Sequence, residues 1–570
     1  MAGTNQQSIL VIFGDRTPQK NKEWHRQFDE VIGPEKLKTF INPGSIQEAY
    51  RLVNKLSGLS KTINYKGYEL WWMNYESLYD KFCLPYTQYA GLLSYLKDYK
   101  KVCFFNPPYP YLFQYFLEAH GCKFSVFKPF HLKNLLPLPA GVLIQVFLSF
   151  LFLPWLKIKR AKLMVWTSDK FSLPRDHDFR MGFIYDELRK RKIRFIEFIR
   201  GLEPWYVVLQ HAIARKRPVF YSAAVTMLVY SLAKAFGKKD KIPQSSSSLS
   251  EEETFWFLTA THYLRDITAA IWAIKIIEAV LKFVGIKTAI ITVATARTLH
   301  EVLGCKLAGI KTVGIQHGVP ILEYCVYDFM PGFTGKKSFS VDKYGVWSDW
   351  WKEYYLSVGR AYHEEQLEVS GPMRPISIKP ASSSFTPRAD SLKVLFISEQ
   401  LAFPNEVISY LLTVLEEKDF TLYLKFRPYR DGFELWLKQN QPEFYKKLLE
   451  KAKILRGTME EAIGVCDVVV GSHSTAVLEA LLQLKPPVFF RTQKWGDYFG
   501  MRSFNHEGRF FAENPEELVE KIRKSIDMPK EDLKKLQKRF FGDPYQNGSA
   551  WVVDEVEKFL KFSEQKQNKS

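Results

Sequence analysis

The sequence predicts an α/β protein whose sheets are parallel. Short apolar runs rich in Val, Ile and Phe alternate with longer stretches of helical periodicity along most of the chain. This alternation is typical of strand–helix–strand units, in which each helix returns the chain to begin a parallel neighbour. The chain has 570 residues, more than one compact core usually holds, so we expect roughly three to four domains.

Composition narrows the class of partner. Hydrophobic residues make up 46% of the chain and charged residues 25%, which argues against disorder or a fibrous repeat. The 80 Lys and Arg outnumber the 61 Asp and Glu, and the net charge of +19 indicates an acidic partner. Aromatic residues reach 15%, which favours a membrane interface or stacking on sugars. The six cysteines have no close pair, so they predict neither a zinc site nor a disulfide scaffold and favour a reducing cytosol.

Residues 1–130 predict a small α/β domain of unknown role. Residues 8–13 (SILVIF) have the pattern of a buried strand that opens into a loop at 14–17. Further strands are expected at 101–105 and 123–127. No basic segment precedes the first apolar run, so we expect no secretory signal.

A hydrophobic segment follows at 131–160. Residues 134–156 carry no charge, and these 23 residues are long enough to cross a hydrocarbon core of about 30 Å. Prolines near both ends and the basic run KIKRAK at 157–162 favour an interfacial or re-entrant membrane segment. A single span and a buried core helix are the alternatives. A second basic stretch at 205–241 encloses the apolar run 218–236, which suits a helix on an anionic surface or a core helix equally.

Two larger α/β units complete the chain, at 161–345 and 393–570, with a connection at 346–392. The last unit alternates most regularly and predicts a doubly wound parallel sheet, in which ligands bind beyond the carboxyl ends of the strands. The strands expected in these two units are 161–168, 193–200, 288–294, 312–316, 393–398, 421–426, 454–455, 467–471 and 487–491.

The loop after the strand DVVV carries small hydroxyl side chains. The sequence GSHST at 471–475 leads into a helix expected over 475–484. Hydroxyls and backbone N–H groups at a helix start bind phosphate well, although an ordinary N-cap has the same composition. Glu479 lies about one helical turn further on, where a carboxylate can accept hydrogen bonds from ribose hydroxyls. The candidate phosphate ligands are Ser472, Ser474 and Thr475.

Two more loops after strands carry chemistry. Lys425 and Arg427 lie in a run with three cations within six residues, which predicts a pyrophosphate clamp or, alternatively, a solvated basic turn. His317 follows the strand TVGIQ and precedes Gly318. A histidine beside a glycine at a strand end approaches substrate closely, so His317 is a candidate general base, with a structural histidine as the alternative.

These features together resemble a known family. The two Rossmann-like halves, the QHG sequence at 316–318, the Lys-x-x-Pro loop at 425–428 and DVVVGSHSTAVLEAL at 467–481 are similar to GT-B glycosyltransferases. Within that fold they resemble bacterial surface- and capsule-polysaccharide transferases, a group including polysialyltransferases, Kdo transferases and teichoic-acid glycerophosphotransferases. The resemblance covers about 160–565 and implies a GT-B architecture preceded by the small α/β domain and the membrane-associating segment.

The resemblance also implies roles for particular residues. In those relatives a His-Pro pair follows the lysine-bearing strand, and Arg427 stands here in place of that histidine, which leaves the nucleotide base open. Glu479 falls where such enzymes hold the donor ribose. His317 matches the His-Gly of the glycerophosphotransferases, where the histidine is read as the base. The serine motif that holds the phosphate of a cytidine or uridine nucleotide corresponds to Ser472, Ser474 and Thr475.

We therefore expect a glycosyltransferase at the cytoplasmic face of the cell membrane, peripheral or re-entrant. Its donor is a nucleotide-activated sugar of the CMP, CDP or UDP type, and its acceptor a lipid-linked or polysaccharide chain, with an anionic membrane surface as a further partner. No cofactor is expected. Residues 176–178 (Asp-His-Asp) match the Asp-x-Asp metal pattern of some glycosyltransferases, but no apolar strand directly precedes them, so no metal site is predicted.

Three other functions compete with this one. A nucleotide-sugar 2-epimerase has the same fold and similar loops, but its soluble substrate requires no membrane. A nucleic-acid-binding protein would explain the charge, yet the sequence has no recognised reading module, so no nucleic-acid partner is expected. A non-catalytic scaffold that kept the fold is left open by Arg427.

Overall fold

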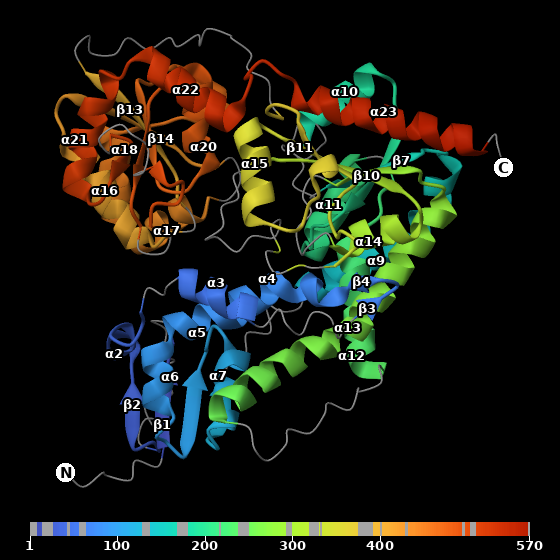
Figure 1. Ribbon diagram of the computed structural model, residues 1–570. Coiled ribbons are helices and arrows are strands. Elements are labelled where there is room, and N and C mark those ends of the chain that lie inside the picture. The colour runs from blue at the N-terminus through green and yellow to red at the C-terminus, as the bar shows by residue number, and fades with distance from the viewer. Residues whose placement is uncertain are drawn as a thin grey trace.

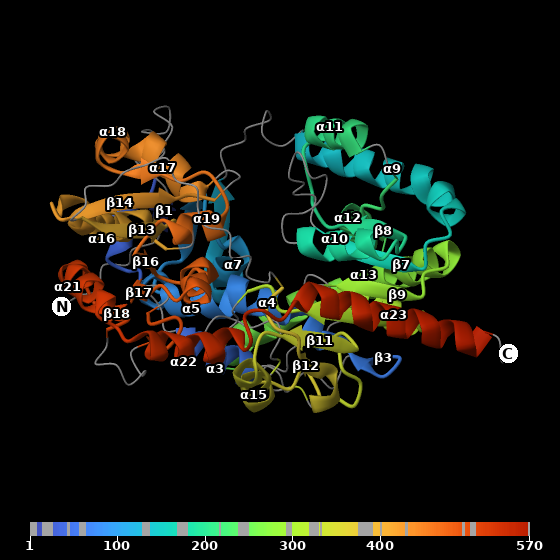
Figure 2. The same cartoon turned by 90° about the horizontal axis from the view of Figure 1, so that it is seen from above.

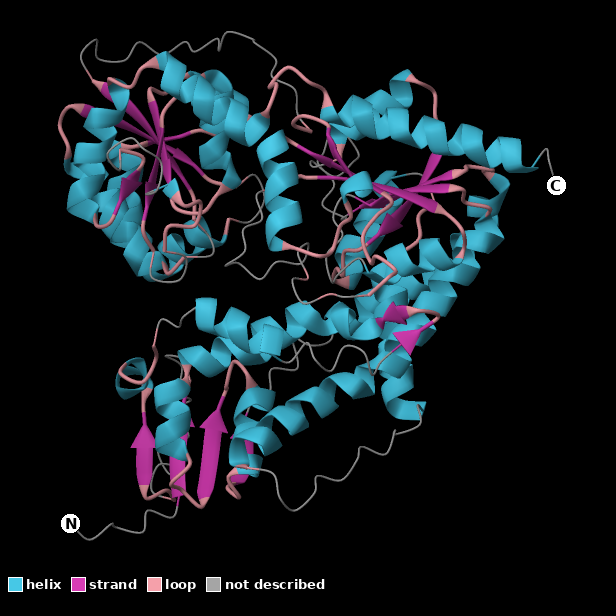
Figure 3. Ribbon diagram, viewed as in Figure 1, coloured by secondary structure: helices cyan, strands magenta, loops and turns pink. Residues whose placement is uncertain are grey.

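The structure is a computed structural model, and three parallel sheets organise it (Figure 1). Helices cover these sheets (Figure 3). The prediction of an α/β protein with parallel sheets is confirmed. The loops at 14–17 and 176–178 lie outside the described residues. The structure describes residues 8–13, 27–42, 46–55, 64–127, 137–167, 181–215, 218–236, 250–291, 299–318, 330, 333, 335–373, 391–399, 402–427, 431–492, 496–501 and 509–567.

The first unit contains a four-stranded parallel sheet with the order β2-β1-β5-β6. Strand β1 (Ser8–Ile12) is apolar at four positions that are buried, as a strand covered on both faces requires. The expected strands are present as β5 (Lys101–Phe105) and β6 (Lys123–Phe127). The other elements of this unit are β2 (Glu30–Ile32), α2 (Pro34–Lys38), α3 (Ile46–Lys55), β3 (Asn64–Tyr65), β4 (Tyr68–Glu69), η3 (Leu70–Asn74), α4 (Tyr75–Leu78), η4 (Tyr79–Cys83), α5 (Leu84–Gln88), α6 (Ala90–Leu96) and α7 (Pro110–Ala119).

The second unit contains a six-stranded parallel sheet with the order β8-β7-β9-β10-β11-β12. Strand β12 and helix α15 lie in the stretch that we expected to be a connection. Because β12 pairs in parallel register with β11, Leu367 opposite Tyr344, this stretch instead completes the edge of the sheet. The elements are α9 (Pro137–Ile158), β7 (Leu163–Thr167), α10 (Gly182–Lys190), β8 (Phe195–Ile199), α11 (Trp205–Arg215), α12 (Ser222–Phe236), α13 (Glu251–Val284), β9 (Thr288–Ile291), α14 (Leu299–Leu307), β10 (Lys311–Ile315), β11 (Lys343–Val346), α15 (Asp349–Val358), η5 (Glu364–Gln366) and β12 (Leu367–Val369).

The third unit contains a six-stranded parallel sheet with the order β15-β14-β13-β16-β17-β18. The chain leaves β13 towards β14 and β15, then returns to the other side of β13 as β16, so a topological switch point lies between β13 and β16. The elements are β13 (Leu392–Ile397), α16 (Pro404–Glu416), β14 (Phe420–Lys425), α17 (Gly432–Asn440), α18 (Pro442–Lys451), β15 (Lys453–Ile454), α19 (Met459–Gly464), β16 (Val468–Gly471), α20 (Thr475–Leu478), η6 (Glu479–Gln483), β17 (Pro487–Phe490), β18 (Phe511–Ala512), α21 (Pro515–Ile526), α22 (Lys530–Phe541) and α23 (Gly548–Gln567).

Two long helices tie the units together. Helix α13 has 34 residues, begins at a Ser250 capping box and ends at Gly285, whose φ of 88° a glycine adopts without strain. It packs on α7 of the first unit and on α12 and α14 of the second (Figure 1). Helix α23 follows the third unit in sequence but packs on α10 and on β9, β10 and β11, so the chain ends on the second sheet.

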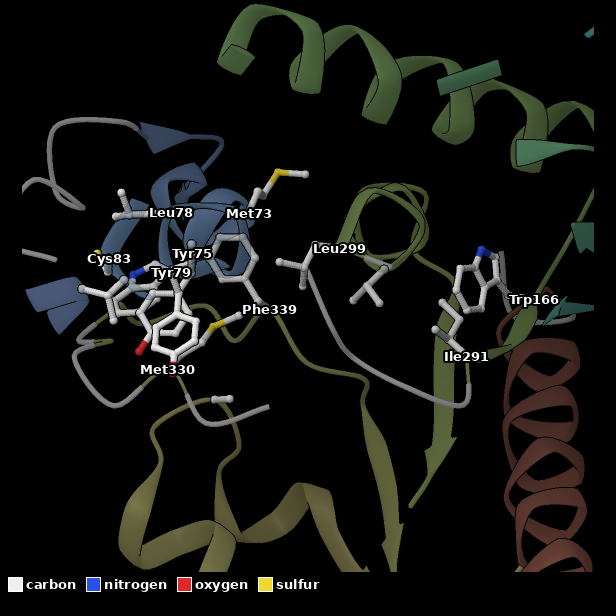
Figure 4. Packing of buried hydrophobic residues seen from close by; sticks show 14 of the residues in the cluster. Met73, Tyr75, Leu78, Tyr79, Cys83, Trp166, Ile291, Leu299, Met330 and Phe339 are labelled. Carbon is white, nitrogen blue, oxygen red and sulfur yellow. The ribbon is translucent and has the colours of Figure 1, made fainter. Parts of the chain in front are cut away.

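An aromatic core joins the first unit to the second. The ring of Trp72 contacts that of Phe333 edge-on at 5.9 Å, and Tyr68 meets Phe339 at 5.8 Å. Around them lie Met73, Tyr75, Leu78, Tyr79 and Met330, all buried (Figure 4). Burial of so much aromatic surface stabilises a fixed junction between the two units.

The uncharged segment forms helix α9. Among the described residues, one helix is apolar and long enough for a membrane span by length and composition alone, over Pro139–Ile158 with a mean hydropathy of 1.9. One third of its most apolar window (33%) is buried in the protein. Membrane association of this segment stays a prediction.

Candidate functional site

The candidate site lies at the switch point of the third sheet. Strands β13 and β16 are hydrogen-bonded neighbours, with Phe396 opposite Val470, so the loops that follow them leave the sheet side by side. The first loop carries Glu399 and the second carries GSHS at 471–474. This juxtaposition places a carboxyl group directly beside the predicted phosphate loop.

Glu399 is buried to 1% exposure and binds the serine loop with both oxygens. Its Oε1 accepts a hydrogen bond from the Ser472 N–H at 2.6 Å. Its Oε2 lies 3.1 Å from His473 Nδ1, and the same nitrogen lies 2.7 Å from Ser472 Oγ. The carboxyl, the hydroxyl and the imidazole therefore form one buried polar cluster that fixes the conformation of the loop.

Gly471 leaves room for this carboxyl. A Cβ at position 471 would lie 2.6 Å from Glu399 Oε1 and 2.5 Å from Val477 Cγ2, both closer than van der Waals contact permits. The loop therefore approaches Glu399 this closely only because its first residue has no side chain.

The Glu399 carboxyl has a perturbed acidity. Burial raises its pKa to about 8, and this outweighs the opposite effects of the Ser472 hydrogen bonds, the Arg427 charge and the Ser474 backbone. A buried carboxyl with a strongly raised pKa at the carboxyl edge of a sheet is typical of functional sites.

Arg427 is exposed beside this cluster, whereas Lys425 is buried. The Arg427 backbone N–H donates to Asp431 Oδ2 at 2.8 Å, and Ser398 Oγ donates to Asp431 Oδ1 at 2.9 Å, so Asp431 joins the loops after β13 and β14. The Lys425 ammonium donates to the carbonyls of Leu455 (3.3 Å) and Gly457. Its predicted contact with phosphate stays a prediction, and its donation to two carbonyls does not favour it.

The helix expected over 475–484 is present over 475–483, but it changes from an α-helix to a 3-10 helix after its first turn. Ser474 is the N-cap of α20, and its Oγ accepts from the Ala476 N–H at 3.4 Å. Only one α-helical turn follows before η6 begins at Glu479, and the segment ends at Leu484 with a φ of 52°. Thr475, the first residue of α20, and Glu479, the first residue of η6, are both half-buried.

The second sheet contributes His317. It follows β10 and is half-buried, next to Gln316, which is buried to 1% exposure. Gln316 Oε1 accepts from the Trp347 N–H at 3.1 Å, and its carbonyl accepts from the Trp347 indole N–H at 2.7 Å. These two hydrogen bonds attach the backbone next to His317 to Trp347, the residue that follows β11.

The two predicted loops meet across the second and third units. A Cβ at Gly318 would lie 3.8 Å from Thr475 Oγ1. The QHG loop after β10 therefore faces the serine loop after β16, and the carboxyl edges of both sheets contribute to one site. The structure brings together the loops of His317, Ser472, Ser474 and Thr475, with Arg427 near Glu399.

A second buried acid lies at the carboxyl edge of the second sheet. Glu301, in the first turn of α14, is 3% exposed, and burial raises its pKa to about 7. Ser222, Trp166 and Arg200 favour its charged form and oppose the rise. Arg200 lies over the Trp166 ring, 5.0 Å from its centroid.

Sequence reasoning missed Glu399 and its partner His473 in the site, and it missed the buried acid Glu301 of the second unit. Glu399 follows its strand within two residues, and this position at a carboxyl edge was the available signal. Glu301 gave no comparable signal, because a glutamate in a helix is usually exposed. No group of three or more His, Cys, Asp or Glu side chains suited to a metal is found in the described parts of the chain, and the predicted absence of a metal stays untested.

Comparisons with known proteins give distant likenesses. No protein-family profile and no curated protein sequence matches the chain. Similar solved structures include glycosyltransferases and UDP-GlcNAc 2-epimerases at low identity. S. aureus MnaA with UDP is 14% identical (70% of this chain, 97% of that chain, TM-score 0.42). A Rickettsia africae glycosyltransferase is 14% identical (70% of this chain, 99% of that chain, TM-score 0.40). The Neisseria meningitidis UDP-GlcNAc 2-epimerase bound to UDP-GlcNAc is 13% identical (70%, 99%, 0.40).

Proposed function

We propose that the protein is a GT-B-type glycosyltransferase that moves a sugar from a nucleotide donor to a lipid-linked or polysaccharide acceptor at the cytoplasmic face of the membrane. The observation that supports this most is the approach of the Gly318 loop to Thr475. Two parallel sheets that turn their carboxyl edges towards one site provide one half for a donor and the other for an acceptor.

The third unit holds the donor in this proposal. Arg427, exposed at the carboxyl end of β14, neutralises the phosphates of a CMP, CDP or UDP sugar. The same phosphates accept hydrogen bonds from the hydroxyls of Ser472, Ser474 and Thr475. The Glu479 carboxylate accepts hydrogen bonds from the ribose hydroxyls. Lys425 acts indirectly, because its ammonium holds the carbonyls at 455 and 457 next to the clamp.

The second unit supplies the acceptor and the base. His317 takes the proton from the acceptor hydroxyl, whose oxygen then attacks the anomeric carbon as the bond to the nucleotide phosphate breaks. The cations and N–H groups of the third unit stabilise the charge that develops on the leaving phosphate. Glu399 is a positioning residue, since it holds the Ser472 N–H and His473.

Nucleotide binding tests the proposal. Melting temperatures and calorimetric titrations are measured with CMP, CDP, UDP, GDP and ADP on the wild type, Arg427→Ala and Ser474→Ala. Lys446→Ala, which removes an exposed cation from the same unit, is the control. A ligand at 100 times its Kd stabilises the folded state by about 2.7 kcal/mol. We expect one pyrimidine nucleotide to raise the melting temperature of the wild type and of Lys446→Ala, with the rise lost in the other two variants.

The comparison uses ligand-induced shifts, because Ser474→Ala also removes a helix cap that contributes about 1 kcal/mol. Incubation of the nucleotide sugar without an acceptor then separates the two enzyme classes. Conversion of the sugar to its 2-epimer would assign the epimerase instead, and binding of none of the five nucleotides would contradict the transferase.

A further inference from the structure

Helix α9 exposes an apolar face on the outside of the protein. Its large apolar side chains recur at spacings of three and four residues, so they share one face of the helix. That face points out of the protein, where these side chains are 49 to 75% exposed. Its members are Leu143, Phe147, Phe150, Leu151, Trp155 and Ile158.

The two uncharged polar side chains of α9 point into the protein. Gln145 and Ser149 are fully buried. Gln145 Nε2 donates to the Gly201 carbonyl at 2.8 Å, and Ser149 Oγ accepts from the Tyr221 N–H at 2.8 Å. A helix that faces water has the opposite arrangement, so the sequence of α9 is suited to an apolar medium on its outer side.

Helix α11 widens this surface. It packs beside α9 at the outer edge of the second unit (Figure 2). The two approach closely because position 141 is glycine: a Cβ there would lie 2.0 Å from the Glu203 carbonyl. The apolar side chains of α11 that are exposed by 39 to 76% are Trp205, Tyr206, Leu209 and Ile213. These four residues and the six of α9 form the α9–α11 face.

Basic side chains predominate in the helices around the α9–α11 face, and the half-buried acid Glu203 lies in the loop that precedes α11. Helices α9, α11 and α12 contain no Asp or Glu. Basic residues Lys157, Lys159 and Arg160 are exposed where α9 ends, and Lys157 Nζ lies 4.3 Å from the Phe283 ring. Aromatic side chains beside cations are complementary to the head-group region of an anionic bilayer.

We propose that the α9–α11 face lies flat in the interface of an anionic membrane, with both helices parallel to the bilayer and neither spanning it. A spanning α9 would need lipid on all sides, whereas Val142, Val146 and Leu156 on its inner side are buried against the protein. This inference rests on the proposed function only for its purpose, which is to bring the acceptor half to a lipid-linked acceptor.

Vesicle flotation of the full chain tests the binding. The variant carries Leu143→Gln, Phe147→Gln, Leu151→Gln and Trp155→Gln. The control carries Leu435→Gln, Leu449→Gln and Ile526→Gln, which replace apolar residues of the third unit that are 48 to 50% exposed. We expect the wild type and the control to float with vesicles containing one third phosphatidylglycerol, and the four-residue variant to lose at least 10-fold in binding. The wild type should bind less to phosphatidylcholine vesicles, and added salt should weaken its binding to the anionic vesicles.

Two further measurements distinguish the arrangements. Lipids brominated near the head group should quench the Trp155 contribution, obtained by difference from Trp155→Phe, more than lipids brominated near the chain end. Equal flotation of the variant, or resistance of bound protein to alkaline carbonate, would overturn the flat arrangement. A wild-type dimer that the variant breaks, without vesicle binding, would assign the face to a second copy and overturn the proposal.

The proposed function is tested separately by nucleotide-induced shifts of the four-residue variant. Retained shifts with lost flotation support both proposals, and retained flotation without any nucleotide binding supports the membrane face while the transferase fails. A melting temperature equal to that of the wild type excludes misfolding as the cause of lost flotation.

Discussion

Glu399 combines deep burial with contacts to a loop that the chain reaches 73 residues later. The carboxyl accepts the Ser472 N–H and faces His473, so its protonation state affects the conformation of the proposed phosphate loop. The charge of Arg427 lowers the pKa of Glu399 and so opposes the rise caused by burial. Arg427 lies on the side where donor phosphates are proposed to bind. A bound phosphate would weaken that effect of Arg427 and hold the proton on Glu399 more firmly.

This carboxyl makes stability depend on pH with a defined sign. Its pKa is about 8 in the folded protein against 4.5 without perturbation, so folding takes up a proton between these values. The stability contributed by this group is full below pH 4.5 and is lost as the pH rises towards 8. Glutamine copies the shape of the protonated acid, so Glu399→Gln should gain melting temperature relative to the wild type as the pH rises from 5 to 8, by about 1 °C per kcal/mol in a chain of this length.

The control for this series is Glu443→Gln, which changes an exposed glutamate of the same unit. Its difference from the wild type should stay constant across the same pH range. A constant difference for Glu399→Gln as well would mean that the buried carboxyl does not hold its proton at neutral pH.

The sequence located the loops of the candidate site but not their buried partners. The hydroxyls at 472–475 and the cation at Arg427 were recognisable because they follow apolar runs directly. The contact of Glu399 with Ser472 depends on the pairing of β13 with β16, which the linear order does not specify. The Lys425 ammonium likewise donates to carbonyls at 455 and 457, in the loop that follows the neighbouring strand β15.

Among the helices, α9 departs most from ordinary water-facing behaviour. Its composition predicted an apolar helix, and the structure contains one, but composition alone does not specify which face packs on the protein. The edge elements β12 and α15 were missed for a related reason: the strand LEV is short and mixed, and only its pairing with β11 makes it a strand.

The two faces of α9 should respond to substitution in opposite ways. Ser149→Ala removes the acceptor of the buried Tyr221 N–H and should destabilise the protein by about 1–3 kcal/mol. Phe147→Gln, on the exposed face, should change stability by less than about 0.5 kcal/mol in lipid-free buffer. Urea unfolding of both variants checks this. A larger loss for Phe147→Gln than for Ser149→Ala would mean that the apolar face is covered by protein in solution.

In the whole molecule, the organisation into three parallel-sheet units was predictable because each has its own strand–helix alternation. The packing of α23 on the second sheet was not predictable, because the sequence of a helix does not specify the sheet on which it packs. The approach of the QHG loop to the serine loop is likewise a property of the assembled units, since residues 318 and 475 have no local relation.

A covalent bridge between these loops tests both their distance and the need for motion between the two units. A Cβ at 318 would lie 3.8 Å from Thr475 Oγ1, so Gly318→Cys combined with Thr475→Cys should form a disulfide on mild oxidation. Mass spectrometry of the digested protein detects the bridge. Donor entry and product release require the units to separate, so the oxidised double variant should lose sugar transfer and recover it on reduction to the level of the Thr475→Cys single variant. Each single variant and the oxidised wild type are controls for pairing with native cysteines, of which those at 83, 103, 122, 305 and 466 are buried and Cys325 lies outside the described residues. Absence of the bridge would place the loops further apart in solution, and full activity of the bridged protein would show that the two units work without separating.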